Sequence, residues 1–122
     1  MKEQLGRRTW VFPDAELPPP GDSLLKGHEA LIVLNTGSQR AILTITFYFT
    51  GSEPAESTPI IVEPERVRCV RLDRESDVGF RVPLEEQYAF KVESNIPVVA
   101  QYGRLDARQT NLAYYTTMGY SA

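Results

Sequence analysis

The feature that most constrains the fold is a run of alternating side chains between Arg40 and Thr50. One side of this run collects the apolar residues Ala41, Leu43, Ile45, Phe47 and Phe49. Threonines dominate the positions between them. A repeat of two built from β-branched and aromatic residues indicates a strand rather than a helix. The turn-forming residues Thr36–Gln39 join this run to a second apolar segment, His28–Asn35, so the sequence predicts an antiparallel hairpin.

Turn-forming residues divide the rest of the chain into short apolar segments, which is typical of an all-β protein. The predicted strands are Arg8–Phe12, His28–Asn35, Arg40–Thr50, Pro59–Val62, Arg66–Leu72, Gln87–Ser94, Val98–Leu105 and Asn111–Met118, with a shorter one near Gly79–Val82. The 122 residues suffice for one core and are too few for two domains. We expect a single-domain antiparallel β-sandwich of about eight or nine short strands, spanning residues 1–122.

Two strands carry apolar residues on both faces. Ala30–Leu34 is continuously apolar, which indicates burial either at the centre of a sandwich or under a subunit interface. The last predicted strand and its continuation carry Tyr114, Tyr115, Met118 and Tyr120. These side chains fit either a subunit contact or an ordinary strand with one buried face.

Two segments are expected to be loops. Pro13–Gly27 contains three consecutive prolines, Pro18–Pro20, which favour an extended polyproline conformation and exclude a helix interior or a central strand. Long loops in compact domains are often functional or mobile. Gly51–Thr58 carries a proline and two glutamates and is expected to be an exposed acidic hairpin tip.

Charge and composition disfavour several classes of protein. The net charge at pH 7 is -3, whereas nucleic-acid-binding proteins usually carry a basic excess. The single cysteine, Cys69, cannot form an intrachain disulfide, which fits a reducing compartment. The longest apolar run, Ala30–Leu34, is far shorter than the ~20 residues of a membrane-spanning helix. The N-terminal residues lack the apolar segment of a signal peptide, so we expect a cytoplasmic protein.

The residues of common catalytic and metal chemistry are sparse. One histidine, His28, and one cysteine, Cys69, are too few for a tetrahedral zinc site. The chain has neither a nucleophile elbow nor a glycine-rich phosphate loop. Adjacent carboxylates such as Glu85 and Glu86 are expected to be solvated rather than an acid–base pair. We therefore expect no enzyme activity, no metal and no cofactor.

The most unusual polar stretch follows the apolar residues 98–100 and runs from Gln101 to Gln109. In an extended strand, Arg104, Asp106 and Arg108 share one face. An aspartate between two arginines can fix both guanidinium groups and direct their remaining donors outward. Such a group could bind a carboxylate, a phosphate or a polyol. It could equally be a structural ion-pair network at a sheet edge or a subunit interface.

Arginines also gather in the segment that contains Arg71. The alternation predicts that Val67 and Cys69 face inward, and that Arg71 does so as well unless a bulge at Cys69-Val70 reverses its side. A buried arginine would need partners.

Four further residues are candidates for the site. His28 and Glu29 open a strand directly after the proline-rich loop, and Asn35 ends that strand on the same face as Glu29. Asn35 is also a favourable turn residue before Gly37. The single tryptophan, Trp10, is either core packing or a stacking platform for a sugar or another flat ligand.

Short elements along nearly the whole chain form a recognisable order. They are Gly6-Arg7 with Trp10, Pro18-Pro19 before Gly21, His28-Glu29 before an apolar strand, Leu34-Asn35 before Gly37, Ile45-Thr46 with Tyr48, Val70-Arg71, and Gln101 with Arg104-Leu105-Asp106 and Arg108-Gln109. In these elements the chain resembles the sensory rhodopsin transducer family, small proteins named for a cyanobacterial member that partners a sensory rhodopsin. Two segments, Tyr102-Gly103 and Asp73–Pro83, depart from the rhodopsin-coupled member, so a photosensory role does not follow.

The resemblance implies a β-sandwich that assembles as a homotetramer, with a polar cleft for a small molecule such as a sugar. It also implies a sensor or adaptor rather than an enzyme. The ligand-binding candidates carried over from it are Trp10, His28, Glu29, Asn35, Arg71, Gln101, Arg104, Asp106, Arg108 and Gln109.

Three functions therefore follow from the sequence. The first is a sensor module that binds a sugar-like or anionic small molecule. The second is a signalling adaptor that docks on the cytoplasmic face of a membrane receptor through the loops Pro13–Gly27 and Gly51–Thr58. The third is a DNA-binding regulator, which would require a local basic patch despite the negative net charge.

Overall fold

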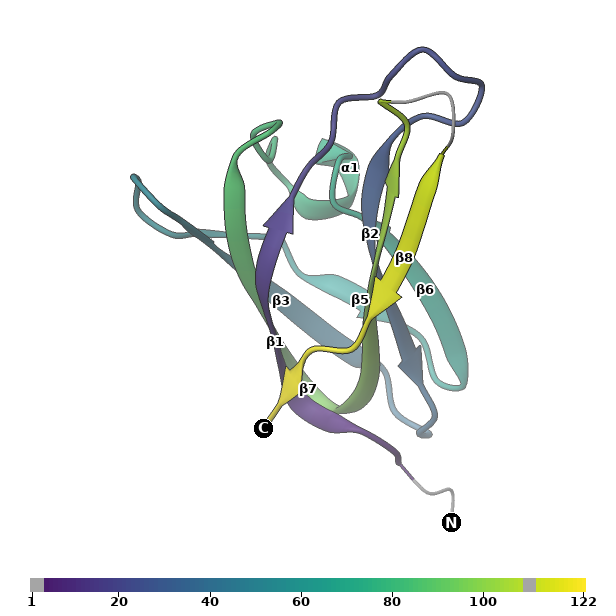
Figure 1. Ribbon diagram of the computed structural model, residues 1–122. Coiled ribbons are helices and arrows are strands. Elements are labelled where there is room, and N and C mark those ends of the chain that lie inside the picture. Colours follow the sequence, from purple (N-terminus) through teal and green to yellow (C-terminus); the bar gives the residue numbers. More distant parts are fainter. Residues whose placement is uncertain (1–3, 109–111) are drawn as a thin grey trace.

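The computed structural model describes residues 4–108 and 112–122, and most of the described chain is strand (Figure 1). The strands are β1 (Arg7–Glu16), β2 (His28–Asn35), β3 (Ala41–Phe49), β4 (Ala55–Glu56), β5 (Ile60–Val62), β6 (Arg66–Arg71), β7 (Gln87–Asp106), β8 (Ala113–Thr117) and β9 (Tyr120–Ser121). One short helix, α1 (Glu75–Val78), lies between β6 and β7. All strand pairs are antiparallel, which confirms the predicted fold class.

Strand β7 organises the fold because it belongs to both halves of one continuous sheet. The first part of β7 pairs with β1 on one side and with β3 on the other. The second part pairs with β2 and β8. One half of the sheet therefore has the order β4-β3-β7-β1-β9, with β5 also on β3, and the other half has the order β6-β2-β7-β8. The predicted hairpin between His28–Asn35 and Arg40–Thr50 is wrong, because β2 and β3 do not pair and lie in opposite halves.

The sequence predicts two strands, Gln87–Ser94 and Val98–Leu105, where the structure has the single strand β7. The register between β1 and β7 shifts between the pairs Arg7–Val98 and Thr9–Glu93. Between these two pairs, β7 contains more residues than β1 and forms a bulge. Such a bulge tolerates Pro97, which lacks the N–H that a regular ladder uses. Proline therefore marks the passage of β7 from one half-sheet to the other, and not an end of the strand.

One core lies between the two half-sheets. Phe12 of β1 stacks on Phe90 of β7 with ring centroids 4.8 Å apart. Phe47 of β3 meets Phe80 edge to face at 5.0 Å. Tyr102 belongs to the second part of β7, and its ring centroid lies 6.0 Å from that of Phe90. The aromatic cluster therefore joins both halves of the sheet. Each large apolar side chain buried in this way contributes about 1.5–3 kcal/mol.

Strand β1 is longer than the predicted Arg8–Phe12 and continues to Glu16. The register with β7 shifts again between Phe12 and Ala15, so Pro13 sits in a bulge where no ladder N–H is required. The predicted loop from Pro13 to Gly27 therefore begins later, after Glu16.

The predicted facing of β6 is wrong. Val67 and Cys69 are exposed, whereas Val70 is fully buried. The pairing of β6 with β2 is unbroken from Arg66 to Arg71, so no bulge reverses the alternation. Alternation shows which residues of β6 share a face, but it does not show which face is buried. Val70 pairs with the buried Leu31 of β2, so the face that contains Val70 is the buried one.

Two smaller differences concern the connections. The segment Gly79–Val82 is not a strand: α1 ends at Gly79, whose φ of 92° is the left-handed conformation that glycine favours at a helix end. The predicted acidic tip Gly51–Thr58 includes the short strand β4, which pairs with β3.

An opening separates β1 from β8. Within the described chain, β8 pairs with β7 alone, and β1 pairs with β9 only at Trp10 and Val11. The chain leaves β8, crosses below the opening and reaches β9 beside β1 (Figure 1). The inner face of β7 therefore lies behind a gap between two strands that do not pair with each other.

Candidate functional site

The centre of the site is a completely buried carboxylate, Glu29, the second residue of β2. The Tyr88 hydroxyl donates a hydrogen bond of 2.6 Å to Glu29 Oε1. The Tyr102 hydroxyl donates to Oε2, and the backbone N–H of Glu16 donates to the same oxygen at 3.1 Å. Burying a carboxyl group is costly without such donors, and two strands, β1 and β7, supply them to Glu29 on β2.

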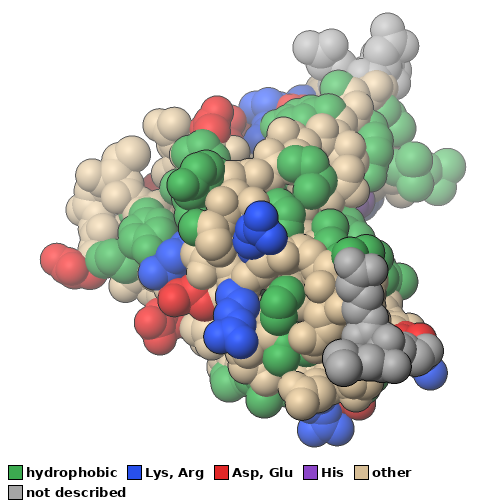
Figure 2. Space-filling view, turned by 90° about the horizontal axis from the view of Figure 1, so that it is seen from below, with side chains coloured by type: hydrophobic (Ala, Val, Ile, Leu, Met, Phe, Trp, Pro, Cys, Tyr) green, Lys and Arg blue, Asp and Glu red, His purple; other side chains and the backbone are tan. Residues whose placement is uncertain are grey.

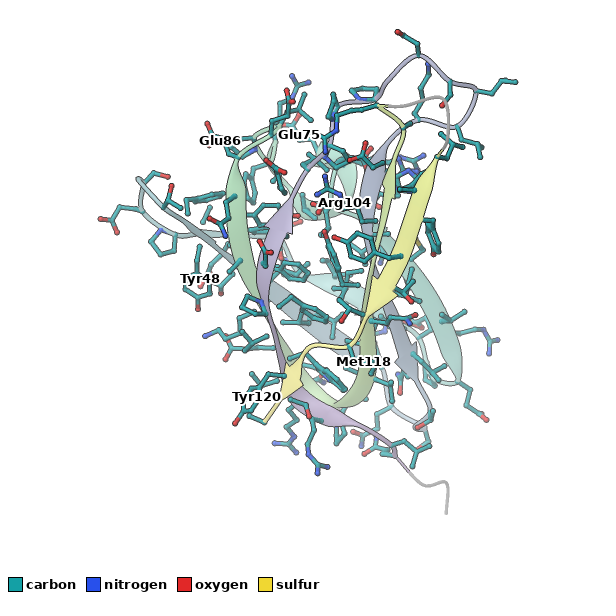
Figure 3. All side chains as sticks on the ribbon, in the orientation of Figure 1. Tyr48, Glu75, Glu86, Arg104, Met118 and Tyr120 are labelled. Atoms are coloured by element: carbon teal, nitrogen blue, oxygen red, sulfur yellow. The ribbon has the colours of Figure 1, made fainter. Side chains whose placement is uncertain are left out.

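Arg104 lies beside this carboxylate. Its side chain is 10% exposed, and Nη1 is 3.5 Å from Glu29 Oε2. Nη1 also donates to the backbone oxygen of Glu16, and Nη2 lies 3.3 Å from Asp106 Oδ2. Figure 3 shows Arg104 between β1 and β8, at the opening. The guanidinium is therefore held in one orientation by groups on β1, β2 and β7.

Arg104 and Asp106 share one face of β7 as predicted, whereas Arg108 lies beyond the end of the strand and still contacts Asp106. Asp106 accepts from Arg104 and, through both oxygens, from Arg108. These hydrogen bonds, led by those from Arg108, hold the pKa of the Asp106 carboxyl well below its ordinary value. The aspartate fixes both arginines, as the spacing indicates.

Burial raises the pKa of both Glu29 and Tyr88. Desolvation raises the pKa of Glu29, while the Tyr88 hydroxyl, the Glu16 N–H and the Arg104 charge oppose that rise. Burial raises the pKa of Tyr88 well above its ordinary value, and the adjacent Glu29 adds to the effect. Tyr88 therefore remains a hydrogen-bond donor, and Glu29 has a higher proton affinity than an exposed carboxyl.

A groove lies between β1 and β8. Its polar part, about 250 Å³, is lined by Asp14, Ala15, Glu16, Arg104 and Tyr115. A larger part, about 550 Å³, is lined by Phe12, Pro13, Asp14, Tyr102 and residues 115–118. The two parts share Asp14 and Tyr115, so together they form one groove. The volume of the larger part is in the range of small-molecule sites.

The structure thus brings together four of the ten predicted site residues: Glu29, Arg104, Asp106 and Arg108. A fifth, His28, precedes Glu29 on β2, and its Nδ1 lies 2.8 Å from the Lys26 carbonyl oxygen.

Two predicted site residues have structural partners elsewhere. Trp10 is buried in the core, where its indole N–H donates to the Val98 carbonyl at 2.9 Å. Asn35 is fully buried at the far end of β2, about 20 Å along the strand from Glu29. Its amide donates to the Gln39 and Val62 carbonyls, and its Oδ1 accepts from the Gly37 N–H, so it fixes the turn.

Two other candidates face away from the groove. Arg71 lies on the face of β6 opposite to the buried Val70, and its guanidinium pairs with Asp73 at 2.7 Å. Gln101 sits between the buried Ala100 and Tyr102 on β7, so alternation turns it to the outer face. The last candidate, Gln109, lies outside the described residues.

Sequence reasoning missed the tyrosines of the site. Tyr88 and Tyr102 belong to the inner face of β7, where the residues between them, such as Phe90, Val92 and Ala100, are apolar. A tyrosine on such a face needs a partner for its hydroxyl, and this signal could have linked both residues to Glu29, the acidic residue of β2. Glu16 and Asp14 were assigned to a loop because β1 was predicted to end too early.

The charge on the surface is mixed. In the view from below, the described Lys and Arg side chains are interspersed with acidic, hydrophobic and other groups (Figure 2). Among the described residues, no group of three or more His, Cys, Asp or Glu side chains is placed to hold a metal ion. No helix in the described part of the chain is long and apolar enough to cross a membrane.

The fold and the site define a small all-β module with a charged cluster at the base of an open groove. A family model described as Anabaena sensory rhodopsin transducer matches residues 5–121, and the chain belongs to that family. The resemblance seen in the sequence is thereby confirmed.

Solved structures agree with this assignment. The crystal structure of Thermotoga maritima 1070 is 35% identical, has a TM-score of 0.87, and the match covers 96% of each chain. The Anabaena sensory rhodopsin transducer is 28% identical with a TM-score of 0.72, over 82% of this chain and 96% of that one. A comparison with curated proteins finds no match.

Proposed function

We propose that the chain is a non-enzymatic sensor module that binds a small polar molecule in the groove between β1 and β8. The observation that carries the proposal is the guanidinium of Arg104, which is held by Glu29, Glu16 and Asp106 and lines the polar part of the groove. A donor oriented before the ligand arrives loses little conformational entropy on binding. An arginine-centred site of this kind suits a sugar-like molecule or an anionic metabolite.

A purely structural ion-pair network is the competing interpretation. Buried ion pairs add little net stability, because desolvation of the charges offsets their attraction. The cluster also lies against a groove and not at the centre of the core. Both points support a role in binding.

A thermal-shift screen with sugars, sugar phosphates and carboxylates tests the proposal. A ligand at a hundred times its dissociation constant stabilises the folded state by about 2.7 kcal/mol, which gives a clear shift. We expect Arg104→Lys to abolish that shift, because an ammonium cannot reproduce the fork of donors. Arg40→Lys is the matched control, since Arg40 forms an exposed ion pair with Glu63. A shift that survives Arg104→Lys would place the ligand elsewhere, and no shift with any compound would favour an adaptor.

The adaptor is the second candidate function, and the loop between β1 and β2 favours it. Leu24 and Leu25 on this loop are 99% and 60% exposed. Neighbouring exposed leucines are typical of protein-binding surfaces. The loop projects from one end of the molecule (Figure 1), where it could dock on the cytoplasmic face of a membrane receptor.

Substitution of both leucines by serine tests docking. We expect loss of receptor capture in a pull-down without loss of thermal stability. Leu84→Ser, at a site 51% exposed, is the control. Retained capture in the double variant would exclude this loop. The other loop named from the sequence, Gly51–Thr58, includes the buried Ser57, whose hydroxyl accepts from the Ile45 N–H, so its deletion would disturb the fold.

A homotetramer is also proposed, because the outer face of the second half-sheet carries exposed apolar residues on the paired strands β2 and β6. Val67 is 65% exposed, Leu34 is 41% exposed, and Cys69 lies beside them on β6. We expect Val67→Lys to reduce the assembled mass in light scattering, whereas Ile42→Lys on β3 leaves it unchanged. A wild-type monomer, or a tetramer that persists in Val67→Lys, would contradict the proposal.

A further inference from the structure

The larger part of the groove is lined mainly by apolar and aromatic groups. Phe12 and Pro13 of β1 form one side, and Tyr115 and Met118 form the other. Figure 3 shows Met118 at the lower end of the opening, below Arg104. Asp14 stands where this apolar part meets the polar part. The groove is therefore amphipathic along its length.

The positive charges of the polar part are already neutralised. Arg104 lies within 3.5 Å of Glu29 and 3.3 Å of Asp106, and one of its terminal nitrogens also donates to a backbone oxygen of β1. Arg108 forms its bidentate pair with Asp106. Neither guanidinium offers an uncompensated positive charge to an incoming ligand.

Carboxylates are in excess at the same place. Asp14 receives a hydrogen bond of 3.3 Å from the neutral amide of Gln87. Glu16 is 3.9 Å from Arg104, whose charge Glu29 and Asp106 already share. Even when Glu29 carries a proton, the carboxylates of Asp14, Glu16 and Asp106 outnumber the two guanidinium groups. A cation is therefore attracted to the Asp14 side of the groove.

Aromatic surface accompanies the carboxylates. Tyr115 is 49% exposed and lines both parts of the groove, next to Asp14. The ring of Tyr102 lies 6.3 Å from that of Tyr115 and supports it from below. A cation beside the face of an aromatic ring gains cation–π stabilisation, and a neighbouring carboxylate strengthens its binding.

From this combination we infer that the groove binds an organic cation. Its ammonium group lies between the Asp14 carboxylate and the Tyr115 ring, and its apolar substituent occupies the part lined by Phe12, Pro13 and Met118. The inference rests on the proposed function, since it names the ligand class for the same groove. It adds a cationic class, recognised at the Asp14 side of the groove, to the ligand classes that the proposed function names.

Isothermal titration with three matched probes tests the ligand class. The probes are benzyltrimethylammonium, benzyl alcohol and phenylacetate, which share a phenyl ring and differ in charge. We expect the ammonium compound to bind at least tenfold more tightly than the other two. Its affinity should fall as salt is added, because part of the attraction is electrostatic.

Two pairs of variants locate the site. Asp14→Asn should weaken binding of benzyltrimethylammonium about tenfold, whereas Glu53→Gln on the exposed β3–β4 loop removes the same charge and should leave affinity within twofold. Tyr115→Leu should weaken it severalfold, because leucine keeps apolar area and lacks the π face. Tyr120→Leu, at a residue 71% exposed, is its control.

The outcomes separate this inference from the proposed function. Equal affinity for phenylacetate or benzyl alcohol, no binding of the ammonium probe, or binding unaffected by Asp14→Asn would overturn the cationic class. If a sugar or carboxylate then binds in an Arg104-dependent manner, the proposed function stands without this inference. If neither screen yields a ligand, both fail.

Discussion

Replacing Arg104 with methionine removes the guanidinium and keeps much of the apolar length of the side chain. The change leaves the carboxyl group of Glu29 completely buried without its cation. Removal of one partner from a buried ion pair costs about 3–5 kcal/mol. The lower end applies here, because Tyr88, Tyr102 and the Glu16 N–H still donate to Glu29. We expect a loss of about 3 kcal/mol at pH 7, or roughly 10 °C in Tm.

The loss should depend on pH. Burial already raises the pKa of Glu29 above its ordinary value of 4.5, and Arg104 is one of the groups that oppose the rise. Without Arg104 the pKa of Glu29 in the folded state rises further. A carboxyl group whose pKa is raised by folding favours the folded state at low pH, and that stability is lost as the pH rises through the folded-state pKa. The difference in stability between Arg104→Met and the wild type should therefore shrink between pH 7 and pH 5.

A second substitution isolates the cause. Adding Glu29→Gln to Arg104→Met removes the uncompensated charge and should restore most of the lost stability at pH 7. Urea unfolding is followed by the fluorescence of Trp10, the single tryptophan, which is 6% exposed in the core. Protein concentration is held fixed, because assembly would couple to unfolding. An equal loss at pH 5 and pH 7 with no restoration by Glu29→Gln would refute the reasoning and assign the role of Arg104 to packing.

Three other substitutions address single groups. Folding lowers the pKa of the Asp106 carboxyl, so the wild type should lose stability as the pH falls below 3.8, the ordinary pKa of this group. Asp106→Asn should remove that loss, which is measured as a flatter dependence of the urea midpoint on pH between about pH 2 and 5. Asn35→Ala should lower the unfolding free energy by about 2–3 kcal/mol, because it leaves buried backbone groups of the turn unpaired, and ligand affinity measured by titration should not change. Tyr102→Phe should lower the unfolding free energy by about 1–2 kcal/mol through loss of one donor to Glu29, and an unchanged urea midpoint would contradict that role.

The sequence predicted well where one local pattern dominates. The strand His28–Asn35 has the predicted bounds, and β3 lies within the predicted Arg40–Thr50, because alternation along the chain specifies an extended strand. The predicted pairing of these two strands is wrong, because β2 pairs with β6 and β7 whereas β3 pairs with β4, β5 and β7. The grouping of Arg104 and Asp106 also follows from spacing along one extended strand.

Prediction was poorer where proline had two possible roles. Pro13 directly follows the predicted strand Arg8–Phe12 and Pro97 directly precedes the predicted strand Val98–Leu105, and both prolines lie inside strands of the structure. A proline is tolerated at a bulge, and whether a bulge forms depends on how many residues the neighbouring strand contributes. That count belongs to the pairing of β1 with β7, which local sequence does not contain.

By itself, therefore, the sequence determined the all-β class, the positions of the strands β2 and β3 and the linear order of the charged residues 104–108. Only the tertiary structure decided which of those residues meet Glu29, which face of β6 is buried, and that Asp14 and Glu16 line the same groove as Arg104. The physical reason is that alternation fixes relative facing within one strand, whereas contacts between strands depend on register across long separations in the chain. Glu29 and Tyr102 are 73 residues apart and meet because β2 pairs with the second part of β7. The passage of β7 through both half-sheets brings Tyr88, from its first part, to the same carboxylate.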